Sequence, residues 1–266
     1  MIINNINDIL ELLNKRMITK RQAIERVKNE FGGVVYAENA SKIEKIAYAN
    51  SLIDYAEWKK EMKAKNQSIP VLWYYGETGS GKTRKAKEEC EKRGINYYLA
   101  GGSRPFDGAV GLTADEQEAL IIDDLRPNIV HYIDLLQIFD PSNYDVVVST
   151  HHRKAFLMPK IIIVTSLYSP EGFYFASATD DTNDDKHLNR CITQVLRFTK
   201  EKIETITTEF KETGSATCGI LQRVHPTVYS EPNPFYENTE QRHDVLITPD
   251  EPFDNIFGTT ESKAEK

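Results

Sequence analysis

The chain has 266 residues, 40% of them apolar and 27% charged, which suffices for one sizeable α/β domain and a smaller appendage. No apolar run reaches the roughly 18 to 20 residues of a membrane span, and the N-terminus lacks the basic and apolar segments of a signal peptide. The net charge of −7 is uneven, because residues 226–266 carry −6 and the rest is nearly neutral. A nearly neutral body can still present a local basic channel, so the charge does not exclude a nucleic-acid partner.

Cysteine usage indicates a reducing environment. Cys90, Cys191 and Cys218 are odd in number and have no metal-ligand spacing. This pattern favours free thiols over a disulfide framework or a zinc site. We therefore expect a cytoplasmic protein that does not enter a membrane.

Residues 1–68 have the pattern of a small helical domain. The pairs Thr19–Gln22 and Ser41–Glu44 both fit the capping box, which satisfies free amide groups at the start of a helix. Apolar residues recur at helical spacing after each start, and Gly32–Gly33 separates the two segments. The segment is predicted to be a linker or oligomerisation element; the alternative is a helical layer that only packs on the next domain.

Residues 69–200 alternate apolar segments with polar helical ones, as a parallel sheet with crossover helices requires. The predicted strands are 71–75, 96–100, 119–123, 161–165 and 192–198, the predicted helices are 82–92 and 128–139, and a hairpin is predicted from 145–149 and 155–158. Residues 201–225 are predicted to form a weakly β-like extension. Residues 226–266, with five prolines and an acidic excess, are predicted to be a disordered tail.

A phosphate-binding loop follows the first predicted strand. The segment GETGSGKT at 76–83 satisfies the G-x-x-x-x-G-K-[ST] pattern in full. Its glycines permit a tight turn that directs backbone N–H groups at phosphate oxygens, and the following helix directs its positive dipole end there. Lys82 is predicted to contact the β- and γ-phosphates, and Thr83 to ligate Mg²⁺. The residues predicted to bind ATP are Gly76, Glu77, Thr78, Gly79, Ser80, Gly81, Lys82 and Thr83.

Two adjacent acids follow the third predicted strand. Asp123 and Asp124 end the apolar run LIIDD, and such a strand end is where the Mg²⁺-binding acid reaches the phosphate loop. Asp123 is predicted to hold Mg²⁺ through water, and Asp124 to orient or deprotonate the attacking water. Lys82 and Asp123 are 41 positions apart, which leaves room for only a minimal set of strands between them.

Residues 71–199 resemble the superfamily-3 helicase domain of plasmid and small-DNA-virus replication initiators, in particular rolling-circle Rep proteins of Gram-positive plasmids. The motifs that carry the resemblance are GETGSGKT at 76–83, LIIDDLRP at 120–127, IIIVTS at 161–166 and NRC at 189–191. The resemblance implies an α/β fold of the AAA+ P-loop NTPase type, with a five-stranded parallel sheet and flanking helices. It also implies an ATPase that assembles as a hexameric ring and acts on single-stranded DNA.

Two further catalytic roles are implied by the resemblance alone. Thr165 or Ser166 falls at the end of the sensor strand, where a polar side chain contacts the γ-phosphate and the water. Many relatives have Asn near this point, and this chain has none until Asn183. Arg190 matches the finger that reaches the nucleotide of a neighbouring subunit and supplies positive charge to the transition state. Relatives often carry paired arginines, whereas Asn189 occupies the first position here.

The predicted hairpin has a basic tip. In the resembling family this position holds the hairpin that projects into the central pore, and His152, Arg153 and Lys154 are predicted to contact nucleic-acid phosphates without reading sequence. The alternative is a tip that is polar only because it is solvated. His151 and His152 have no cysteine or acidic partner at ligand spacing, so no metal site is predicted there.

A nicking centre is absent from the predicted sites. The initiators that this chain resembles carry an N-terminal nuclease with a His-hydrophobic-His metal motif, and residues 1–70 contain no histidine. We expect the chain to be a fragment, the product of a split gene, or a stand-alone motor that works with a separate nicking nuclease.

Four functions share these motifs. The leading one is an ATP-dependent DNA helicase or translocase in the replication of a plasmid or mobile element. An RNA helicase is the second, because nothing in the sequence shows whether a 2′-hydroxyl is recognised. A small-molecule kinase would need an arginine-rich lid, and residues 179–188 are acidic instead. The fourth is a nucleotide-gated assembly or DNA-binding subunit with little unwinding activity.

Overall fold

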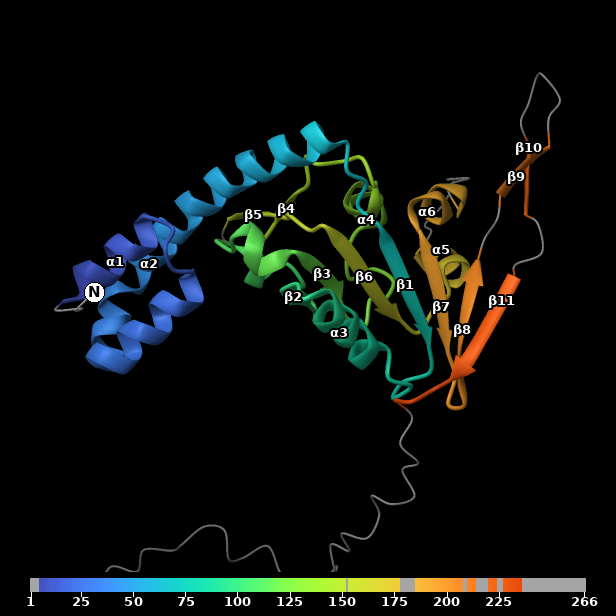
Figure 1. Cartoon of the computed structure of the whole chain (residues 1–266), viewed down its shortest axis with the longest axis horizontal. Coiled ribbons are helices and arrows are strands. Elements are labelled where there is room, and N and C mark those ends of the chain that lie inside the picture. Colours follow the sequence, from blue (N-terminus) through green and yellow to red (C-terminus); the bar gives the residue numbers. More distant parts are fainter. Residues whose placement is uncertain are drawn as a thin grey trace, which may run out of the picture. The chain divides into compact units, whose positions relative to one another are not determined.

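The computed structural model describes residues 5–151, 153–177, 185–207, 210–213, 220–223 and 227–235 (Figure 1). The chain divides into two units, Met1–Tyr236 and Glu237–Lys266, and every described residue belongs to the first. None of the described helices is both long and apolar enough to cross a membrane. Cys90 and Cys191 are free thiols in buried positions, and Cys218 lies outside the described residues.

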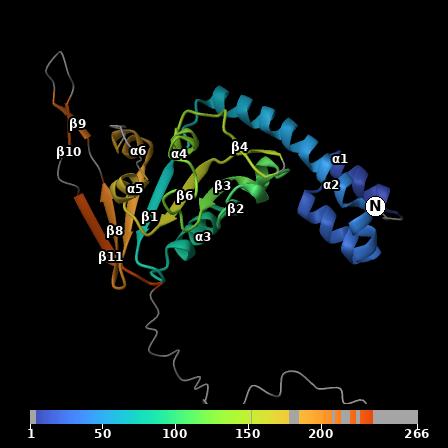
Figure 2. The same ribbon diagram turned by 180° about the vertical axis from the view of Figure 1, so that it is seen from behind.

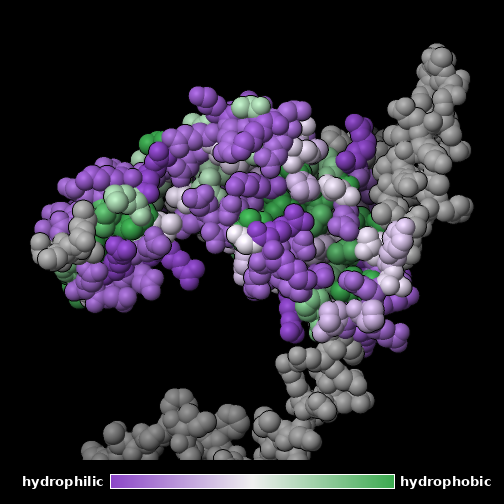
Figure 3. Space-filling view, in the orientation of Figure 1, coloured by the Kyte–Doolittle hydropathy of each residue, from purple (hydrophilic) through white to green (hydrophobic). Residues whose placement is uncertain are grey.

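Two helical elements come first, α1 (Ile6–Asn14) and α2 (Lys20–Lys65). They share a small core made of Ile9, Leu12, Leu13, Ile18, Ala23, Val27 and Ile43. The other end of α2 packs on the α/β domain, because Trp58 and Met62 are buried in that domain's core. The outward side of α2 is mostly hydrophilic (Figure 3), so this long helix buries one side and leaves the other to solvent.

The glycines divide α2 as predicted, but only one of the two predicted capping boxes exists. At Thr19 the side chain accepts from the Gln22 amide, and the Gln22 side chain accepts from the Thr19 amide. Gly32 has φ 85° and ψ 170°, and these backbone angles are not helical. Element α2 therefore consists of two helices joined at this residue. The predicted cap at Ser41 is wrong, because the chain is already helical again before it and Ser41 lies inside the second helix.

A seven-stranded sheet with the order β11-β8-β7-β1-β6-β3-β2 forms the centre of the rest. The strands are β1 (Val71–Gly76), β2 (Tyr97–Ala100), β3 (Ala119–Ile122), β6 (Ile161–Ser166), β7 (Gln194–Phe198), β8 (Lys202–Thr207) and β11 (Thr227–Pro232). From β7 to β2 all neighbours are parallel, and β8 and β11 are added antiparallel. The predicted five-stranded parallel sheet is therefore confirmed, with two antiparallel strands extending it.

The connections between these strands carry the remaining elements. They are α3 (Lys82–Arg93), η1 (Asp107–Ala109), η2 (Ala114–Gln117), α4 (Tyr132–Phe139), α5 (Pro170–Ser177), α6 (Asp185–Cys191), the hairpin β4 (Val147–Ser149) with β5 (Lys154–Phe156), and the pair β9 (Phe210–Thr213) with β10 (Ile220–Arg223). Helix α4 begins later than the predicted residue 128, because Asn128 has a left-handed φ of 68°.

Both faces of the sheet are buried, which explains its continuous apolar strands. Along β1, Val71 and Trp73 belong to one core, while Leu72 and Tyr74 belong to the other. The first core also contains side chains of α4, α5 and α6, and the second contains Ala86 of α3. The sheet is therefore enclosed between α3 on one face and α4, α5 and α6 on the other (Figures 1 and 2).

Strand β11 lies within the segment that was predicted to be a disordered tail. It pairs with β8 over its whole length, from Thr227 opposite Thr207 to Pro232 opposite Lys202. As the edge of the sheet, β11 tolerates a proline, because one side of an edge strand needs no N–H donor. The predicted boundary at residue 226 is therefore too early, and the part of that tail from residue 236 onward lies outside the described residues.

Candidate nucleotide-binding site

The loop that joins β1 to α3 lies at the carboxyl edge of the parallel strands. Gly76, Gly79 and Gly81 have φ values of 140°, 78° and 90°. A β-carbon on Gly76 would overlap the backbone carbonyl of Phe198, and one on Gly81 would overlap the side chain of Phe235. Gly76 and Gly81 are therefore required by both the backbone angles and the close contacts, and Gly79 by its backbone angle alone.

Lys82 is the first residue of α3 and folds back over the loop. Its Nζ donates to the carbonyl oxygens of Gly76 at 2.8 Å and Glu77 at 2.7 Å. Burial lowers the pKa of Lys82, although the negative charges of Asp124 and Asp123 oppose this. The ammonium group is thus held on the loop by two backbone carbonyls, which phosphate oxygens can replace when they enter the cradle.

Asp123 connects three elements of the site. Its Oδ1 accepts from the Thr83 hydroxyl at 2.6 Å and from the Thr165 hydroxyl at 2.8 Å. Asp123 follows β3, Thr165 is in β6 and Thr83 is in the first turn of α3, and all three lie at the carboxyl edge. The structure therefore brings together the predicted loop, the first predicted acid and the predicted sensor strand.

Of the two candidates on the sensor strand, only Thr165 contacts the acids. Its Oγ1 accepts from the Asp124 amide at 2.8 Å while it donates to Asp123. Ser166 donates instead to the Leu125 carbonyl at 2.7 Å. Successive side chains of a strand point to opposite faces, so only one of two adjacent residues can contact the acids.

Asp124 is held in an unusual backbone conformation with its carboxylate toward solvent. Its φ is 50°, in the left-handed region that few residues other than glycine adopt. The carboxylate is 57% exposed and is paired with Arg126, whose Nη2 lies 2.9 Å and Nε 3.0 Å from Oδ2. An exposed carboxylate directly after a metal-ligating candidate can accept a proton from water.

The oxygen atoms present fit a nucleotide-borne Mg²⁺. The Thr83 hydroxyl and the Asp123 carboxylate are both hard oxygen ligands, and they already lie side by side. No group of three or more His, Cys, Asp or Glu side chains that could hold a metal occurs within the described residues. Mg²⁺ is commonly bound through one or two protein groups together with phosphates and water, as the pair Thr83 and Asp123 would allow.

Arg190 lies away from this cluster. It is exposed near the end of α6, just before β7 begins. Because β7 is parallel to β1, Arg190 is at the amino edge of the sheet, a strand length from the phosphate loop (Figure 1). Arg190 thus does not complete the cradle of its own chain.

The base of the β4–β5 hairpin is fixed by a buried glutamine. Gln117, which precedes β3, donates from Nε2 to the Phe156 carbonyl at 3.0 Å and accepts from the Met158 amide at 3.2 Å. Both hydrogen bonds are buried, so they are costly to lose. The hairpin is thereby anchored beside the amino ends of β3 and β6.

The hairpin tip offers less free positive charge than its sequence suggests. Arg153 is half-buried, with its guanidinium 4.9 Å from the ring centre of Tyr48 on α2. Lys154 is exposed at the start of β5. His152 lies outside the described residues. Lys154 is therefore the better placed of the two described cations to contact a phosphate.

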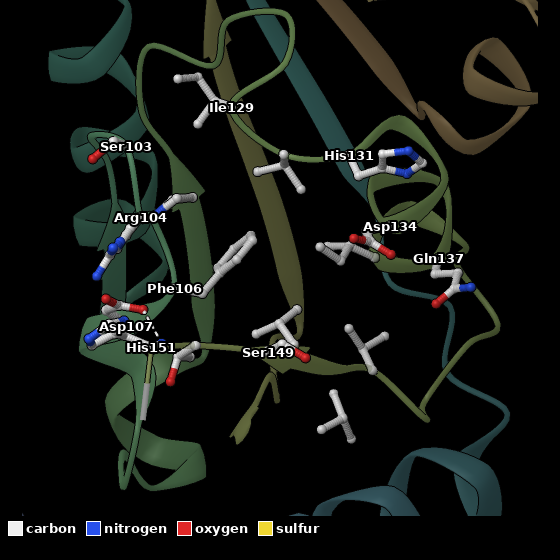
Figure 4. A pocket seen from close by; sticks show the side chains of 17 residues that line it. Ser103, Arg104, Phe106, Asp107, Ile129, His131, Asp134, Gln137, Ser149 and His151 are labelled. Carbon is white, nitrogen blue, oxygen red and sulfur yellow. Dashed lines mark hydrogen bonds between the residues drawn. The ribbon is translucent and has the colours of Figure 1, made fainter. Parts of the chain in front are cut away.

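A cavity of about 400 Å³ borders the hairpin (Figure 4). Arg104, Asp107 and His151 lie together on one side of it, and His131 and Asp134 lie on the other. Asp107 accepts a hydrogen bond from the His151 amide at 3.3 Å, which ties the hairpin to the segment after β2. No residue of the phosphate loop lines this cavity, so it is separate from the nucleotide site.

Two residues at the site had no signal in the sequence. Asn233 and Phe235 follow β11 and contact the phosphate loop. Both fall in the segment whose prolines and charge predicted disorder, and neither belongs to a recognisable motif.

The lowered pKa of Lys82 should make ATP binding sensitive to alkaline pH. Burial favours the neutral amine, so the free protein loses this charge at a lower pH than an ordinary lysine would. We expect the dissociation constant of ATP to rise as the pH approaches the lysine range. In the Lys82→Arg variant the guanidinium stays charged, and the rise should be smaller. Equal pH profiles for the two proteins, measured by titration calorimetry, would contradict this assignment.

The Thr165 hydroxyl should be needed for hydrolysis more than for binding. Thr165→Val leaves the Asp124 amide without an acceptor and removes a donor from Asp123, a loss of about 1 to 3 kcal/mol. We expect kcat for ATP to fall roughly 10- to 100-fold. Thr165→Ser keeps the hydroxyl and serves as the control. If Thr165→Ser is as slow as Thr165→Val in a phosphate-release assay, the methyl group is what matters.

Comparisons with known proteins bear on the resemblance. No family model matches the chain. A "Replication protein" of Onion yellows phytoplasma (strain OY-M) is 28% identical over 139 residues, which are 52% of this chain and 35% of that protein. The chain thus spans about a third of the length of this relative. A solved structure described as "The X-ray structure of JCV Helicase" aligns over 71% of this chain and 52% of that one, with 15% sequence identity and a TM-score of 0.31.

The match to a replication protein agrees with what the phosphate loop and the paired acids indicated. Over about half its length the chain is similar to a replication protein, which confirms a resemblance to replication proteins.

Proposed function

We propose that this chain is an ATP-dependent DNA helicase or translocase that acts in the replication of a plasmid or other mobile element. The observation that carries the proposal is the contact of the Asp123 carboxylate with the hydroxyls of Thr83 and Thr165, next to a glycine loop that holds Lys82. The phytoplasma relative supports a role in replication.

Each residue at the carboxyl edge has a chemical task in this proposal. Bound ATP with Mg²⁺ supplies the phosphoryl group that is transferred to water. The backbone N–H groups of Gly76–Thr83 hold the phosphates, and Lys82 exchanges its carbonyl partners for phosphate oxygens. Thr83 and Asp123 hold the metal, and Asp124 accepts the proton of the attacking water. Thr165 keeps both acids in place through its two hydrogen bonds.

A ring of subunits would explain the position of Arg190. It is exposed and lies at the edge of the sheet opposite its own phosphate loop. A neighbouring subunit that packs against the amino edge could present its nucleotide to this guanidinium, which would stabilise negative charge in the transition state. We propose that active sites are completed in this way between the subunits of a hexamer.

The proposed partner of the β4–β5 hairpin is single-stranded DNA. Lys154 is exposed at the tip, and Arg153 is held near it by the ring of Tyr48. Cations at a loop tip contact phosphates without reading the bases, which suits a motor that must move along any sequence. A nicking nuclease, in a separate protein or elsewhere in a longer chain, would supply the strand cleavage that these residues do not provide.

The first test is ATP hydrolysis with and without single-stranded DNA. We expect stimulation by DNA, and we expect Lys82→Ala to abolish hydrolysis because the phosphates lose their cation. The matched control is Lys92→Ala, at the far end of the same helix, where the exposed lysine pairs with Glu88. Stimulation by RNA alone would favour an RNA helicase. Nucleotide binding without stimulated hydrolysis would favour a nucleotide-gated assembly subunit.

The second test concerns the hairpin. Replacing Arg153 and Lys154 by alanine should weaken DNA binding and leave ATP affinity unchanged. The slope of log K against log salt should become shallower by about 0.7 for each phosphate contact that is lost. Lys154→Ala alone separates the phosphate contact from the packing of Arg153 on Tyr48. An unchanged salt slope in a fluorescence-anisotropy titration would remove the hairpin from the DNA-binding surface.

A further inference from the structure

The last described segment of the chain, residues 231–235, lies against the phosphate loop. Strand β11 ends at Pro232, and the chain then reaches the loop between β1 and α3 (Figure 1). Glu231 is 3.9 Å from the ammonium of Lys85 in α3. Asn233 also forms a hydrogen bond with Ser80 of the loop, although the two residues are 153 positions apart in the sequence.

Asn233 ties the loop to the end of β7. Its Nδ2 donates to the Ser80 carbonyl at 3.0 Å and to the Thr199 carbonyl at 2.6 Å, and its Oδ1 accepts from the Phe235 amide at 3.0 Å. The residue is only 8% exposed. Because the side-chain amide is buried, the loss of any of these hydrogen bonds would leave a buried polar group unsatisfied. The amide therefore holds the phosphate loop in a fixed position relative to the end of β7.

Phe235 places an aromatic ring beside the loop. Its side chain occupies the space that a β-carbon on Gly81 would need. The Arg84 guanidinium is 5.4 Å and the Lys85 ammonium 5.7 Å from the ring centre. The ring is half-buried, so part of it is accessible. An aromatic surface with a guanidinium against it, next to a phosphate cradle, is the chemistry that stacks on a nucleobase.

We infer that residues 233–235 are part of the nucleotide site, with Asn233 as a positioning residue for the loop and Phe235 with Arg84 as the surface that contacts the nucleobase. The inference rests on the proposed nucleotide binding. If the backbone of residues 76–83 holds the phosphates of a nucleotide, only the sugar separates these phosphates from the base. The base is then within reach of the Phe235 side chain, which lies against Gly81. Stacking accepts any base, so ATP and GTP should bind with similar affinity.

The experiment separates the base from the phosphates. Calorimetric titration of the full chain with Mg²⁺-ATP and with Mg²⁺-tripolyphosphate measures both, because tripolyphosphate has no base. Phe235→Leu keeps an apolar side chain and removes the aromatic face; we expect ATP to bind roughly 10-fold more weakly and tripolyphosphate to bind as before. Asn233→Ala should weaken both ligands by the same factor, since it loosens the loop. Tyr229→Ala, an exposed aromatic on β11, is the control and should change neither.

Each failure has a separate meaning. If Phe235→Leu weakens both ligands equally, or neither, the base surface is wrong. If Asn233→Ala changes neither ligand, its positioning role is wrong. Preserved tripolyphosphate binding in Phe235→Leu also shows that the variant is folded. The proposed function fails independently, when Lys82→Ala binds ATP as tightly as the unaltered chain.

Discussion

The nucleotide site depends on one carboxylate, that of Asp123, which accepts hydrogen bonds from Thr83 and Thr165 at once. The bond from Thr165 is possible because of the register of the sheet, in which Ile122 of β3 lies beside Val164 of β6. Asp123 and Thr165, which follow these two residues, therefore lie at the same level of the sheet, and the Asp123 carboxylate accepts from the Thr165 hydroxyl. A slip of one residue would turn one side chain to the opposite face. The packing of Ile121 and Ile163 in the core against α3 thus sets the chemistry at the strand ends.

The sequence alone predicted what local patterns encode. Glycines at fixed spacing, apolar runs ended by acids and the capping box at Thr19 all reflect forces within a few residues, and the loop, the five parallel strands and the start of α2 follow from them. Two predictions were wrong, one because of the neighbouring helix and one because of a contact between distant segments. Ser41 has the residues of a cap, but the helix had already resumed after Gly32. Asn233 lies in a proline-rich, acidic stretch, and only the three-dimensional fold shows that its amide belongs beside Ser80.

The end of α2 is more than a connection between domains, since an aromatic cluster joins it to the hairpin region. Tyr55 lies 5.0 Å from Phe156 of β5, ring centre to ring centre, and Trp58 lies 6.2 Å from Tyr144. The Tyr55 hydroxyl donates to the Tyr144 carbonyl at 3.2 Å. Such rings add directional packing to the burial of apolar surface. The end of α2 and the hairpin region are therefore packed together through aromatic side chains.

In the proposed motor, hydrolysis and DNA contact are associated with opposite edges of one sheet, and the same two strands reach both. At the carboxyl edge, β3 and β6 end in Asp123 and Thr165. At the amino edge, Gln117 before β3 binds the backbone on both sides of Leu157, where the hairpin joins the chain that leads to β6. Paired strands inside two cores are stiff because close-packed interiors resist deformation. β3 and β6 therefore hold Asp123 and Thr165 at one edge of the sheet, and Gln117 with the base of the hairpin at the other, in a fixed relation to one another.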